Sequence, residues 1–445
     1  MPTRRAARAA CRIRTRVNTR TLADWLSYQE QVNPRAIELG LERVRAVWQR
    51  MGAPRPARHV VTVGGTNGKG STVALLEAML RQAGRRVGCF TSPHLLVYNE
   101  RVRIDGTDVD DASLVAAFER IEAARTQGPD APIPLTYFEF GTLAALDLFA
   151  RADLDVAVLE VGLGGRLDAV NIVDADVVAI TTVDLDHMDW LGSDRDSIGR
   201  EKAGIARSGH PAVVGEAAPP AGLLDALHAL GAKVIRAGID YRVERWLSGW
   251  RWTHRDGTSM TLPDPALAAP VQYANAATAI AVLHALGDGL AGEPPEPAVA
   301  AALREVSVSA RLQALGGDPA LYVDVGHNPQ AARALAQWLD AVPHGRVHAV
   351  FGALSDKDVA GVIQALGSRI DHWHLAGLER DTPRGLPVRA LADVLVAIRP
   401  EARHDVHPGV AGALAAARAS ARPGETILAF GSFFVASAVL AAHRA

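Results

Sequence analysis

The chain has 445 residues, and its 47 lysines and arginines nearly balance its 49 aspartates and glutamates, leaving a formal net charge of −2. This balance provides no long-range attraction to nucleic acid or to an anionic membrane, and no uninterrupted apolar run is long enough to cross a bilayer. The two cysteines, Cys11 and Cys89, are too few for a disulfide framework or a cysteine metal site, so we expect a reducing, cytoplasmic location.

The first 20 residues are rich in arginine and contain no acidic residue. They lack the apolar core of a secretory signal, so we expect a disordered extension, or residues translated from an upstream start codon, rather than a transit peptide. Ordered structure is expected to begin near Thr21. The rest of the chain is long enough for two or three domains.

A glycine-rich loop with a lysine follows the first apolar run. Residues 60–63 indicate a buried parallel strand, and residues 71–80 indicate the next helix. Strand, glycine loop and helix together present backbone N–H groups and a helix N-terminus to a phosphate chain, and Lys69 adds positive charge for the outer phosphates. Val63 and Gly70 depart from the usual Gly-x-x-x-x-Gly-Lys-[Ser/Thr] spacing. The loop therefore predicts nucleotide binding outside the common kinases and GTPases.

Apolar runs then alternate with helical patterns, which is typical of an α/β fold with a mainly parallel sheet. Residues 241–262 indicate a small antiparallel excursion, and the Gly- and Pro-rich residues 289–299 predict a linker. We expect a P-loop-type nucleotide domain over residues 21–288 and a smaller Rossmann-like α/β domain over residues 300–445. Strands are predicted at 86–91, 154–161, 176–183, 211–215, 321–325, 347–351, 372–375 and 426–429. Helices are predicted at 111–124, 138–152, 193–206 and 274–286.

Polar side chains follow two predicted strands of the first domain. Glu160 lies near the end of one strand, beside a glycine cluster, where open α/β sheets bind ligands at the carboxyl ends of their strands. It is placed to hold a metal that bridges phosphate oxygens, although a glutamate there could also cap a helix or face solvent. His187 follows the next strand among three aspartates. Imidazole is an unusual Mg²⁺ ligand, so the pattern alone gives little reason to assign it.

Four further residues have two possible interpretations each. Lys202 lies in a predicted helix, where a lysine is usually solvated, but near phosphates it would supply charge and, if desolvated, would react as a neutral amine. In the second domain Asp324 and His327 cluster at a predicted strand end, and Arg311 follows the linker. If they face the phosphate loop across an interdomain crevice, all of these residues share one active site.

These segments resemble the folylpolyglutamate synthase/dihydrofolate synthase family, ATP-dependent amide ligases related to the Mur ligases of peptidoglycan synthesis. The resemblance runs from about Thr21 to the end of the chain. It rests on Gly-Thr-Asn-Gly-Lys-Gly-Ser (65–71), Thr-Ser-Pro-His-Leu (91–95), Asn-Glu-Arg (99–101), Glu-Val-Gly-Leu-Gly-Gly-Arg-Leu-Asp-Ala-Val-Asn (160–171), Asp-His-Met-Asp-Trp-Leu-Gly (186–192), Glu-Lys-Ala-Gly-Ile (201–205), Asn-Ala-Ala-Thr-Ala (275–279), Asp-Val-Gly-His-Asn-Pro (324–329) and Ser-Asp-Lys-Asp (355–358).

The resemblance implies a role for each matching residue. ATP would contact Gly65, Thr66, Asn67, Gly68, Lys69, Gly70, Ser71, Asn275, Arg311 and Asp324. Mg²⁺, two ions in all, would be held by Ser92, Glu160, His187 and a carbamylated Lys202. The pteroate site would be lined by Gln31, Val32, Asn33, Pro34, Thr136, Tyr137, Phe138, Glu139, Leu167, Asp168 and Ala169, with Phe138 stacked on the pterin. Lys69, Lys202 and His327 would be the catalytic residues, with His327 acting on the incoming amine or only orienting other groups.

The implied activity is an ATP-dependent ligation through an acyl phosphate. It would join L-glutamate to dihydropteroate and extend tetrahydrofolate with γ-linked glutamates. Residues 164–169 resemble those of bifunctional members, so we expect both activities; a monofunctional folylpolyglutamate synthase is the alternative, ahead of a Mur-type ligase or a non-catalytic P-loop switch. Residues 268–274 and 310–313 depart from the family pattern around the adenine site. The expected partners are small molecules, without nucleic acid or membrane, and the expected state is a monomer.

Overall fold

The structure is a computed structural model that describes residues 20–33, 35, 37–128, 131–287, 292, 294–342 and 345–444. The expected extension lies outside these residues except for Arg20, as do Pro34 and residues 289–291 and 293 of the expected linker. The first described helix, α1 (Leu22–Val32), begins at a capping box in which the Thr21 hydroxyl accepts the N–H of Asp24 and the Asp24 carboxylate accepts the N–H of Thr21. Reciprocal capping of this kind explains why the helix starts here.

The first domain is built on an eight-stranded sheet with the order β4-β3-β2-β5-β1-β6-β7-β8. Every neighbouring pair is parallel except β2–β3 and β3–β4. The central strands are almost entirely apolar because helices cover both of their faces. The strands are β1 (His59–Gly64), β2 (Val87–Phe90), β3 (Val102–Ile104), β4 (Thr107–Asp108), β5 (Val156–Glu160), β6 (Val177–Ile180), β7 (Pro211–Val214) and β8 (Lys233–Arg236).

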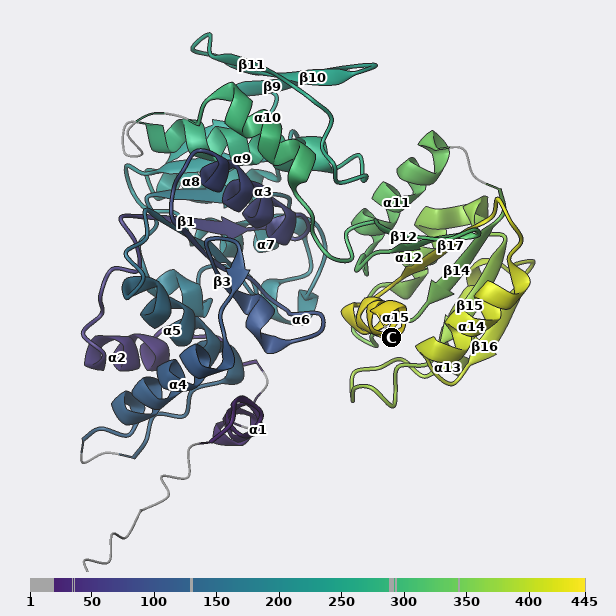
Figure 1. Cartoon of the computed structure of the whole chain (residues 1–445), viewed down its shortest axis with the longest axis horizontal. Coiled ribbons are helices and arrows are strands. Elements are labelled where there is room, and N and C mark those ends of the chain that lie inside the picture. The colour runs from purple at the N-terminus through teal and green to yellow at the C-terminus, as the bar shows by residue number, and fades with distance from the viewer. Residues whose placement is uncertain are drawn as a thin grey trace, which may run out of the picture.

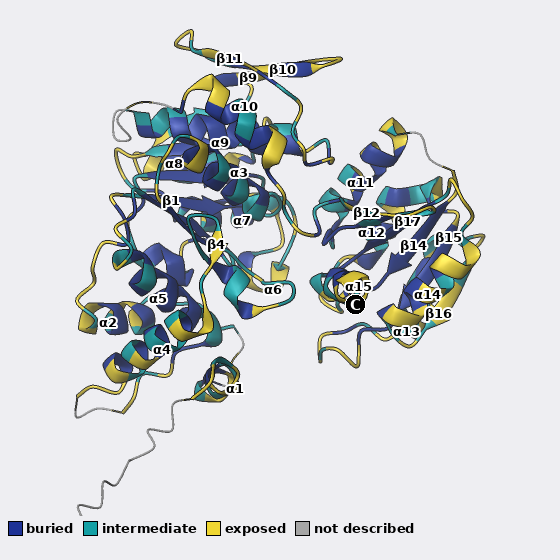
Figure 2. Ribbon diagram, viewed as in Figure 1, coloured by how far each residue is buried: buried dark blue, intermediate teal, exposed yellow. Residues whose placement is uncertain are grey.

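Alternating side chains divide this sheet between two apolar cores. Val61 and Val63 pack with α3 (Lys69–Gln82), α9 (Gln272–Leu286) and α10 (Glu296–Glu305) on one face. Val60 packs in the second core, on the other face of the sheet. Figure 2 shows the buried central strands between the helices that cover them. The helices of that second face and its margin are α1, α2 (Glu42–Arg50), α4 (Asp111–Arg125), α5 (Tyr137–Ala150), α7 (Arg195–Ala203) and α8 (Ala221–Ala229), with the short α6 (Met188–Leu191) and the 3₁₀ turns η1 (Tyr98–Arg101) and η2 (Ala169–Ile172) in connecting loops.

The antiparallel excursion predicted at 241–262 is confirmed. It forms a three-stranded sheet of β9 (Tyr241–Trp246), β10 (Gly249–His254) and β11 (Ser259–Leu262). Figure 1 shows this sheet beyond α9 and α10, on the side away from α4 and α5. Trp250 and Trp252 are fully buried in the same apolar core as α9, which fixes the sheet to the domain.

The second domain has a six-stranded sheet with the order β12-β13-β17-β14-β15-β16, in which only the β12–β13 pair is antiparallel. Helices cover both faces, as expected for a Rossmann-like α/β domain (Figure 1). The strands are β12 (Gln313–Gly316), β13 (Ala320–Val323), β14 (Val347–Phe351), β15 (His372–Ala376), β16 (His404–His407) and β17 (Thr426–Phe430). Helices α11 (Pro329–Ala341), α12 (Val359–Leu366) and α13 (Val388–Ile398) cover one face, α14 (Val410–Ser420) and α15 (Phe433–Arg444) the other, and η4 (Gly367–Arg369) follows α12.

Helix α10 corrects the predicted domain boundary. We expected a linker over 289–299 and the second domain from residue 300, but α10 spans Glu296–Glu305. Val299 and Leu303 are buried in the core shared with α3, so this helix belongs to the first domain. Proline is well tolerated in the first turn of a helix, so part of the Pro-rich stretch marks a helix start. We therefore propose that the chain crosses to the second domain after Val306.

None of the helices in the described part of the chain is long and apolar enough to span a membrane.

Candidate active site

The phosphate loop joins β1 to α3 and is shaped by two glycines with positive φ. A Cβ on Gly65 (φ 145°) would lie 1.9 Å from the Thr181 hydroxyl, and a Cβ on Gly68 (φ 88°) would lie 2.5 Å from Oδ1 of Asn275. Only glycine fits such positions without strain. The Thr181 hydroxyl also donates to the carbonyl of Asn67 at 2.6 Å, which ties the loop to the end of β6. The loop is therefore held in place by close contacts with Thr181 and Asn275.

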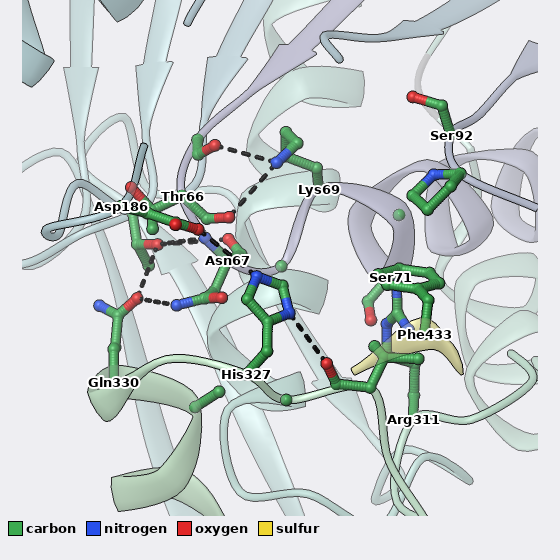
Figure 3. A pocket seen from close by; sticks show the side chains of 18 of the residues that line it. Thr66, Asn67, Lys69, Ser71, Ser92, Asp186, Arg311, His327, Gln330 and Phe433 are labelled. Atoms are coloured by element: carbon green, nitrogen blue, oxygen red, sulfur yellow. Dashed lines mark hydrogen bonds and ion pairs between the residues drawn. The ribbon is translucent and has the colours of Figure 1, made fainter. Parts of the chain in front are cut away.

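Lys69 is the first residue of α3, two residues earlier than the predicted helix start. Its Nζ donates to the carbonyl oxygens of Gly65 and Thr66 at 3.1 and 3.3 Å (Figure 3). The ammonium group thus lies over the loop, at the N-terminus of a helix whose dipole also favours an anion. Loop and lysine together form a site for phosphate groups.

Glu160 ends β5, directly beside Val63 of β1 in the sheet. Its Oε2 accepts the backbone N–H of Ser92 at 3.1 Å. Burial raises the pKa of this carboxyl, and the charges of Lys69 and Arg311 and the Ser92 N–H oppose that rise. A bound cation would further stabilise the ionised form. This buried carboxylate is therefore a suitable metal ligand.

His187 and Ser92 line the same cavity as Glu160. His187 has a left-handed backbone (φ 52°) at the start of the short α6. Burial lowers the pKa of its imidazole to about 4, although the charge of Asp186 opposes this. A neutral imidazole, a hydroxyl and a carboxylate can ligate a divalent cation, so these three side chains fit the metal site expected for them.

Lys202 is buried on α7, which excludes a solvated surface lysine. Burial, helped by the positive charge of Lys69, lowers its pKa to about 7, while Asp186 and Asp168 oppose the change. In a substantial fraction of the molecules, Lys202 is therefore a neutral, nucleophilic amine at neutral pH. It lines the same cavity as Glu160.

Direct contacts join the two domains at the phosphate loop. The Asn67 side chain exchanges hydrogen bonds with Asn328 at 3.1 and 3.0 Å and donates to Oε1 of Gln330. Arg333 of α11 forms an ion pair with Asp184, which follows β6, at 2.8 Å. Figure 3 shows Gln330 and His327 reaching from the second domain toward Asn67 and Asp186. The crevice predicted between the domains is therefore lined from both sides.

Asp186 is the most heavily paired carboxylate at this boundary. Nζ of Lys357 lies 2.6 Å from its Oδ1, and Nε2 of His327 lies 3.5 Å from its Oδ2. Burial would raise the pKa of Asp186, but the hydrogen bond from His327 and the charge of Lys357 outweigh it and hold the pKa far below the usual range. The other ring nitrogen of His327, Nδ1, donates to the carbonyl of Val325 at 3.0 Å. His327 is thus held in place at both ring nitrogens.

Three expected nucleotide contacts also line the cavity: Asn275, Arg311 and Asp324. The Arg311 guanidinium lies 5.6 Å from the centre of the Phe433 ring. Asp324 accepts the N–H groups of Leu312 and Gly326 at 2.7 and 2.6 Å, which fixes the turn that carries Arg311. The altered motif around residues 310–313 therefore still presents an arginine to the crevice.

One cavity of about 710 Å³ collects most of the predicted site. It is lined by Gly65, Thr66, Asn67, Gly68, Lys69, Gly70, Ser71, Ser92, Glu160, His187, Lys202, Asn275, Arg311, Asp324 and His327. Three residues to which we had given no individual role, Gln330, Lys357 and Phe433, line it as well. The only sequence signal for Lys357 was its place in the segment 355–358, and Gln330 closely follows the Asp324 cluster.

The segments expected at the pteroate site lie outside the lining of this cavity. Thr136 and Glu139 form a capping box at the start of α5, and Glu139 also pairs with Arg43 at 3.1 Å. Asn33 is buried and donates to the carbonyl of Pro134 at 3.2 Å, whereas Gln31 is exposed and Val32 and Leu167 are half-buried.

Phe138 and Asp168 come closest to the cavity. A Cβ on Gly162, which lines the cavity, would lie 2.6 Å from the Phe138 ring. Asp168 accepts the N–H of Leu163, another lining residue, at 2.8 Å, and its burial raises its pKa to about 6. Tyr137 stands edge-on to Tyr98, and Ala169 begins η2.

Comparisons with known proteins agree with this geometry. The Mur ligase middle domain matches residues 63–282, and the Mur ligase glutamate ligase domain matches residues 310–433. Dihydrofolate synthase/folylpolyglutamate synthase of Escherichia coli K12 is 45% identical over 420 residues, 94% of each chain. The structure of E. coli FolC in complex with DHPP and ADP has a TM-score of 0.88 at 44% identity, covering 96% of this chain and 99% of that one. A bifunctional folylpolyglutamate synthase/dihydrofolate synthase with Mn, AMPPNP and L-glutamate bound has a TM-score of 0.86 at 46% identity, with the same coverage.

Proposed function

This chain belongs to the dihydrofolate synthase/folylpolyglutamate synthase family of Mur ligases, and we propose that the cavity between its two domains carries both of the family's reactions. It is an ATP-dependent ligase that forms carbon–nitrogen bonds, joining L-glutamate to dihydropteroate and adding γ-linked glutamates to tetrahydrofolate. One observation supports this location above the others: Lys69, Glu160 and Lys202 of the first domain line the same cavity as Arg311, His327 and Lys357 of the second.

ATP is proposed to bind with its phosphates on the loop of residues 65–71. The glycine backbone at Gly65 and Gly68, the N-terminus of α3 and the ammonium of Lys69 support this orientation. Asn275, Arg311 and Asp324 are proposed to contact the rest of the nucleotide, with Arg311 reaching it from the second domain. Solved relatives bind ADP or AMPPNP.

Ser92, Glu160 and His187 would hold a divalent metal, for which we propose Mg²⁺. When bound, such an ion neutralises charge on the transferred phosphoryl group. Lys202 would supply an oxygen ligand for a second ion after its neutral amine reacts with carbon dioxide to form a carbamate. Its burial and lowered pKa support that reaction.

The pteroate is proposed to lie beyond the metal ligands, next to Gly162 and Leu163. Phe138, packed against Gly162, presents an aromatic ring suited to stack on a flat pterin. Asp168 is held by backbone N–H groups beside Leu163 and could bond the ring nitrogens. Thr136 and Glu139 would act indirectly, because their side chains cap the helix that carries Phe138.

The proposed chemistry has two steps. A carboxylate oxygen of the folate substrate attacks the γ-phosphorus of ATP, which breaks the bond to ADP and forms an acyl phosphate, while Lys69 neutralises the phosphate charge. The amine of L-glutamate then attacks the acyl carbon, releases phosphate and leaves the amide. His327, held at both ring nitrogens by Val325 and Asp186, would orient the groups around the incoming amine. The amine proton would pass to the released phosphate. The two domains together would exclude water from the acyl phosphate.

A substrate-dependence assay tests the assignment. Release of ADP by the purified chain should require both L-glutamate and a pteroate substrate, and it should occur with dihydropteroate and with tetrahydrofolate in separate reactions. Release of ADP in the reaction with tetrahydrofolate and L-glutamate, but not in the reaction with dihydropteroate and L-glutamate, would indicate a monofunctional folylpolyglutamate synthase. ADP release that does not depend on both organic substrates would overturn the ligase assignment.

A monomeric state and a cytoplasmic location remain predictions. Light scattering of the purified chain and fractionation of the source cells would test them.

A further inference from the structure

Three histidines are buried together in the second domain, apart from the catalytic cavity. His348 lies near the start of β14, and His372 and His374 lie on β15. All three are at most 5% exposed. Their side chains point to the face covered by α14, because Ala349 and Trp373 of the same strands pack on the opposite face. Lys357, which lines the catalytic cavity, instead follows the carboxyl end of β14.

Two of the ring nitrogens and one hydroxyl lie at spacings suited to a tetrahedral metal, and a nitrogen of the third ring lies nearby. One nitrogen of each ring lies within 4.8 Å of the others. Nδ1 of His348 is 3.3 Å from Nε2 of His374, and the Ser420 hydroxyl is 3.4 Å from each of these atoms. In a tetrahedral zinc site, Zn–N distances of about 2.0–2.1 Å separate neighbouring ligand atoms by about 3.3–3.4 Å. These three atoms therefore already match one face of such a site.

Carboxylates lie behind two of the rings. Oε2 of Glu425 is 3.0 Å from Nε2 of His348, and Oδ2 of Asp405 is 2.8 Å from Nε2 of His372. Histidines that bind metals usually donate their second ring N–H to a carboxylate or carbonyl, which orients the ring. Glu425 is placed to accept from His348 in this way, whereas Asp405 lies close to His372 without an aligned hydrogen bond. The arrangement leaves Nδ1 of His348 and Nδ1 of His372 available as ligand atoms.

An unpaired ring atom points to a missing ligand. Among the described residues, Nδ1 of His372, the ring nitrogen other than the one beside Asp405, is buried and has no hydrogen-bond partner. Buried polar atoms without a partner are rare, and a bound ion is one of their ordinary explanations.

We propose that His348, His372 and His374 form a binding site for a divalent transition metal of the zinc class. Three imidazoles select Zn²⁺, Co²⁺ or Ni²⁺ over Mg²⁺, which prefers oxygen ligands. The fourth position is open to the Ser420 hydroxyl or to water. The metal would join β14 and β15, near their amino ends, to the end of α14. It would lie away from the catalytic cavity and would stabilise the second domain.

Cobalt provides a direct probe, because tetrahedral Co²⁺ has much stronger visible absorption than octahedral Co²⁺. The untagged full chain would be treated with chelator and then titrated with Co²⁺ in excess Mg²⁺, which occupies oxygen-rich sites. We expect one equivalent of tetrahedral Co²⁺, its displacement by Zn²⁺, and a higher melting temperature with Zn²⁺ than with Mg²⁺ alone. Wild-type protein that shows no tetrahedral band overturns the proposal, whatever the variants do.

Matched variants locate the site. His374→Gln should lose the band, whereas His228→Gln, on the exposed side of α8, and His187→Gln, in the catalytic cavity, should keep it. Glu425→Gln should weaken Co²⁺ binding about 10-fold while preserving the band, because it removes only the orienting carboxylate. Circular dichroism checks that each variant is folded, and His348→Gln replaces His374→Gln if the latter is not. A band that survives both ligand variants, or that is lost in His187→Gln, shows that the metal binds elsewhere.

Discussion

At the scale of single residues, the phosphate loop depends on its glycines for space as well as for backbone freedom. Gly68 and Gly84 have similar positive φ angles, 88° and 75°. A Cβ on Gly68 would meet Asn275 at 2.5 Å, whereas nothing lies within 4 Å of a Cβ on Gly84. The two positions therefore separate backbone strain from the steric effect on the nucleotide site.

Gly68→Ala is expected to weaken ADP binding at least about 10-fold, since Asn275 must move and the loop with it, while Gly84→Ala leaves ADP affinity unchanged. Both variants should lose about 1 kcal/mol of stability, because each places a side chain in the left-handed region. Isothermal titration with ADP and urea denaturation measure the two effects. Equal ADP affinity in both variants would show that the space at Gly68 has no role in binding.

Lys202 provides a second prediction at this scale. If its carbamate supplies a metal ligand, Lys202→Ala should lose most of its turnover, and a short carboxylic acid such as acetate should restore part of it by replacing the missing oxygens. The matched control is Lys69→Ala, where a cation is missing and acetate should not help. Rates of ADP release with and without acetate decide the matter. Equal responses of the two variants to acetate would exclude the carbamate.

At the scale of elements, the start of α5 has both a structural and an expected binding role. Thr136 and Glu139 cap the helix through reciprocal hydrogen bonds, and Phe138 follows one residue inside it. Capping residues of this type contribute about 1 kcal/mol each. The cap therefore positions the aromatic ring that we propose for the pterin.

Thr136→Ala should destabilise the first domain by about 1 kcal/mol, and Thr136→Ser should preserve both stability and the KM for dihydropteroate, because serine retains the capping hydroxyl. Urea denaturation and steady-state kinetics test the pair. A raised KM in Thr136→Ser, without any loss of stability, would instead indicate direct contact between the threonine methyl group and the substrate.

The sequence predicted the central elements better than the edges. Residues 60–63 and 71–80 correspond to β1 and α3, because a buried apolar strand and a helical pattern flank the glycine loop. The edge strands β8 and β16 were missed, since Lys233-Val-Ile-Arg236 and His404-Asp-Val-His407 are short and carry polar ends. Edge strands bury less of their surface, so their apolar pattern is weaker.

At the scale of the whole molecule, the two domains meet through side chains that are distant in sequence. Asp186 and Lys357 are 171 residues apart and form an ion pair at 2.6 Å. The strand-end rule placed Glu160 and His187 near the phosphate loop because neighbouring parallel strands end at one edge of a sheet. No such rule relates a loop of one sheet to a loop of another, so the partner of Asp186 could not be predicted.

Lys357→Met should loosen this interface, because it removes the cation that pairs with a buried carboxylate. Breaking a buried pair in this way typically costs about 3–5 kcal/mol. We expect a larger radius of gyration in small-angle scattering without nucleotide and a lower kcat, while Lys233→Met, at an exposed edge strand, changes neither. An unchanged radius of gyration and kcat in Lys357→Met would show that the pair does not hold the domains together.

In the proposed reaction, ATP activates the substrate carboxylate as an acyl phosphate inside the interdomain cavity. Dihydropteroate labelled with ¹⁸O in its carboxylate tests this most directly, with mass spectrometry of the phosphate released in the presence of ATP and L-glutamate. An acyl phosphate predicts one ¹⁸O atom in each phosphate, because the attacking carboxylate oxygen leaves with the phosphoryl group. Unlabelled phosphate, formed together with the amide product, would exclude an acyl phosphate intermediate.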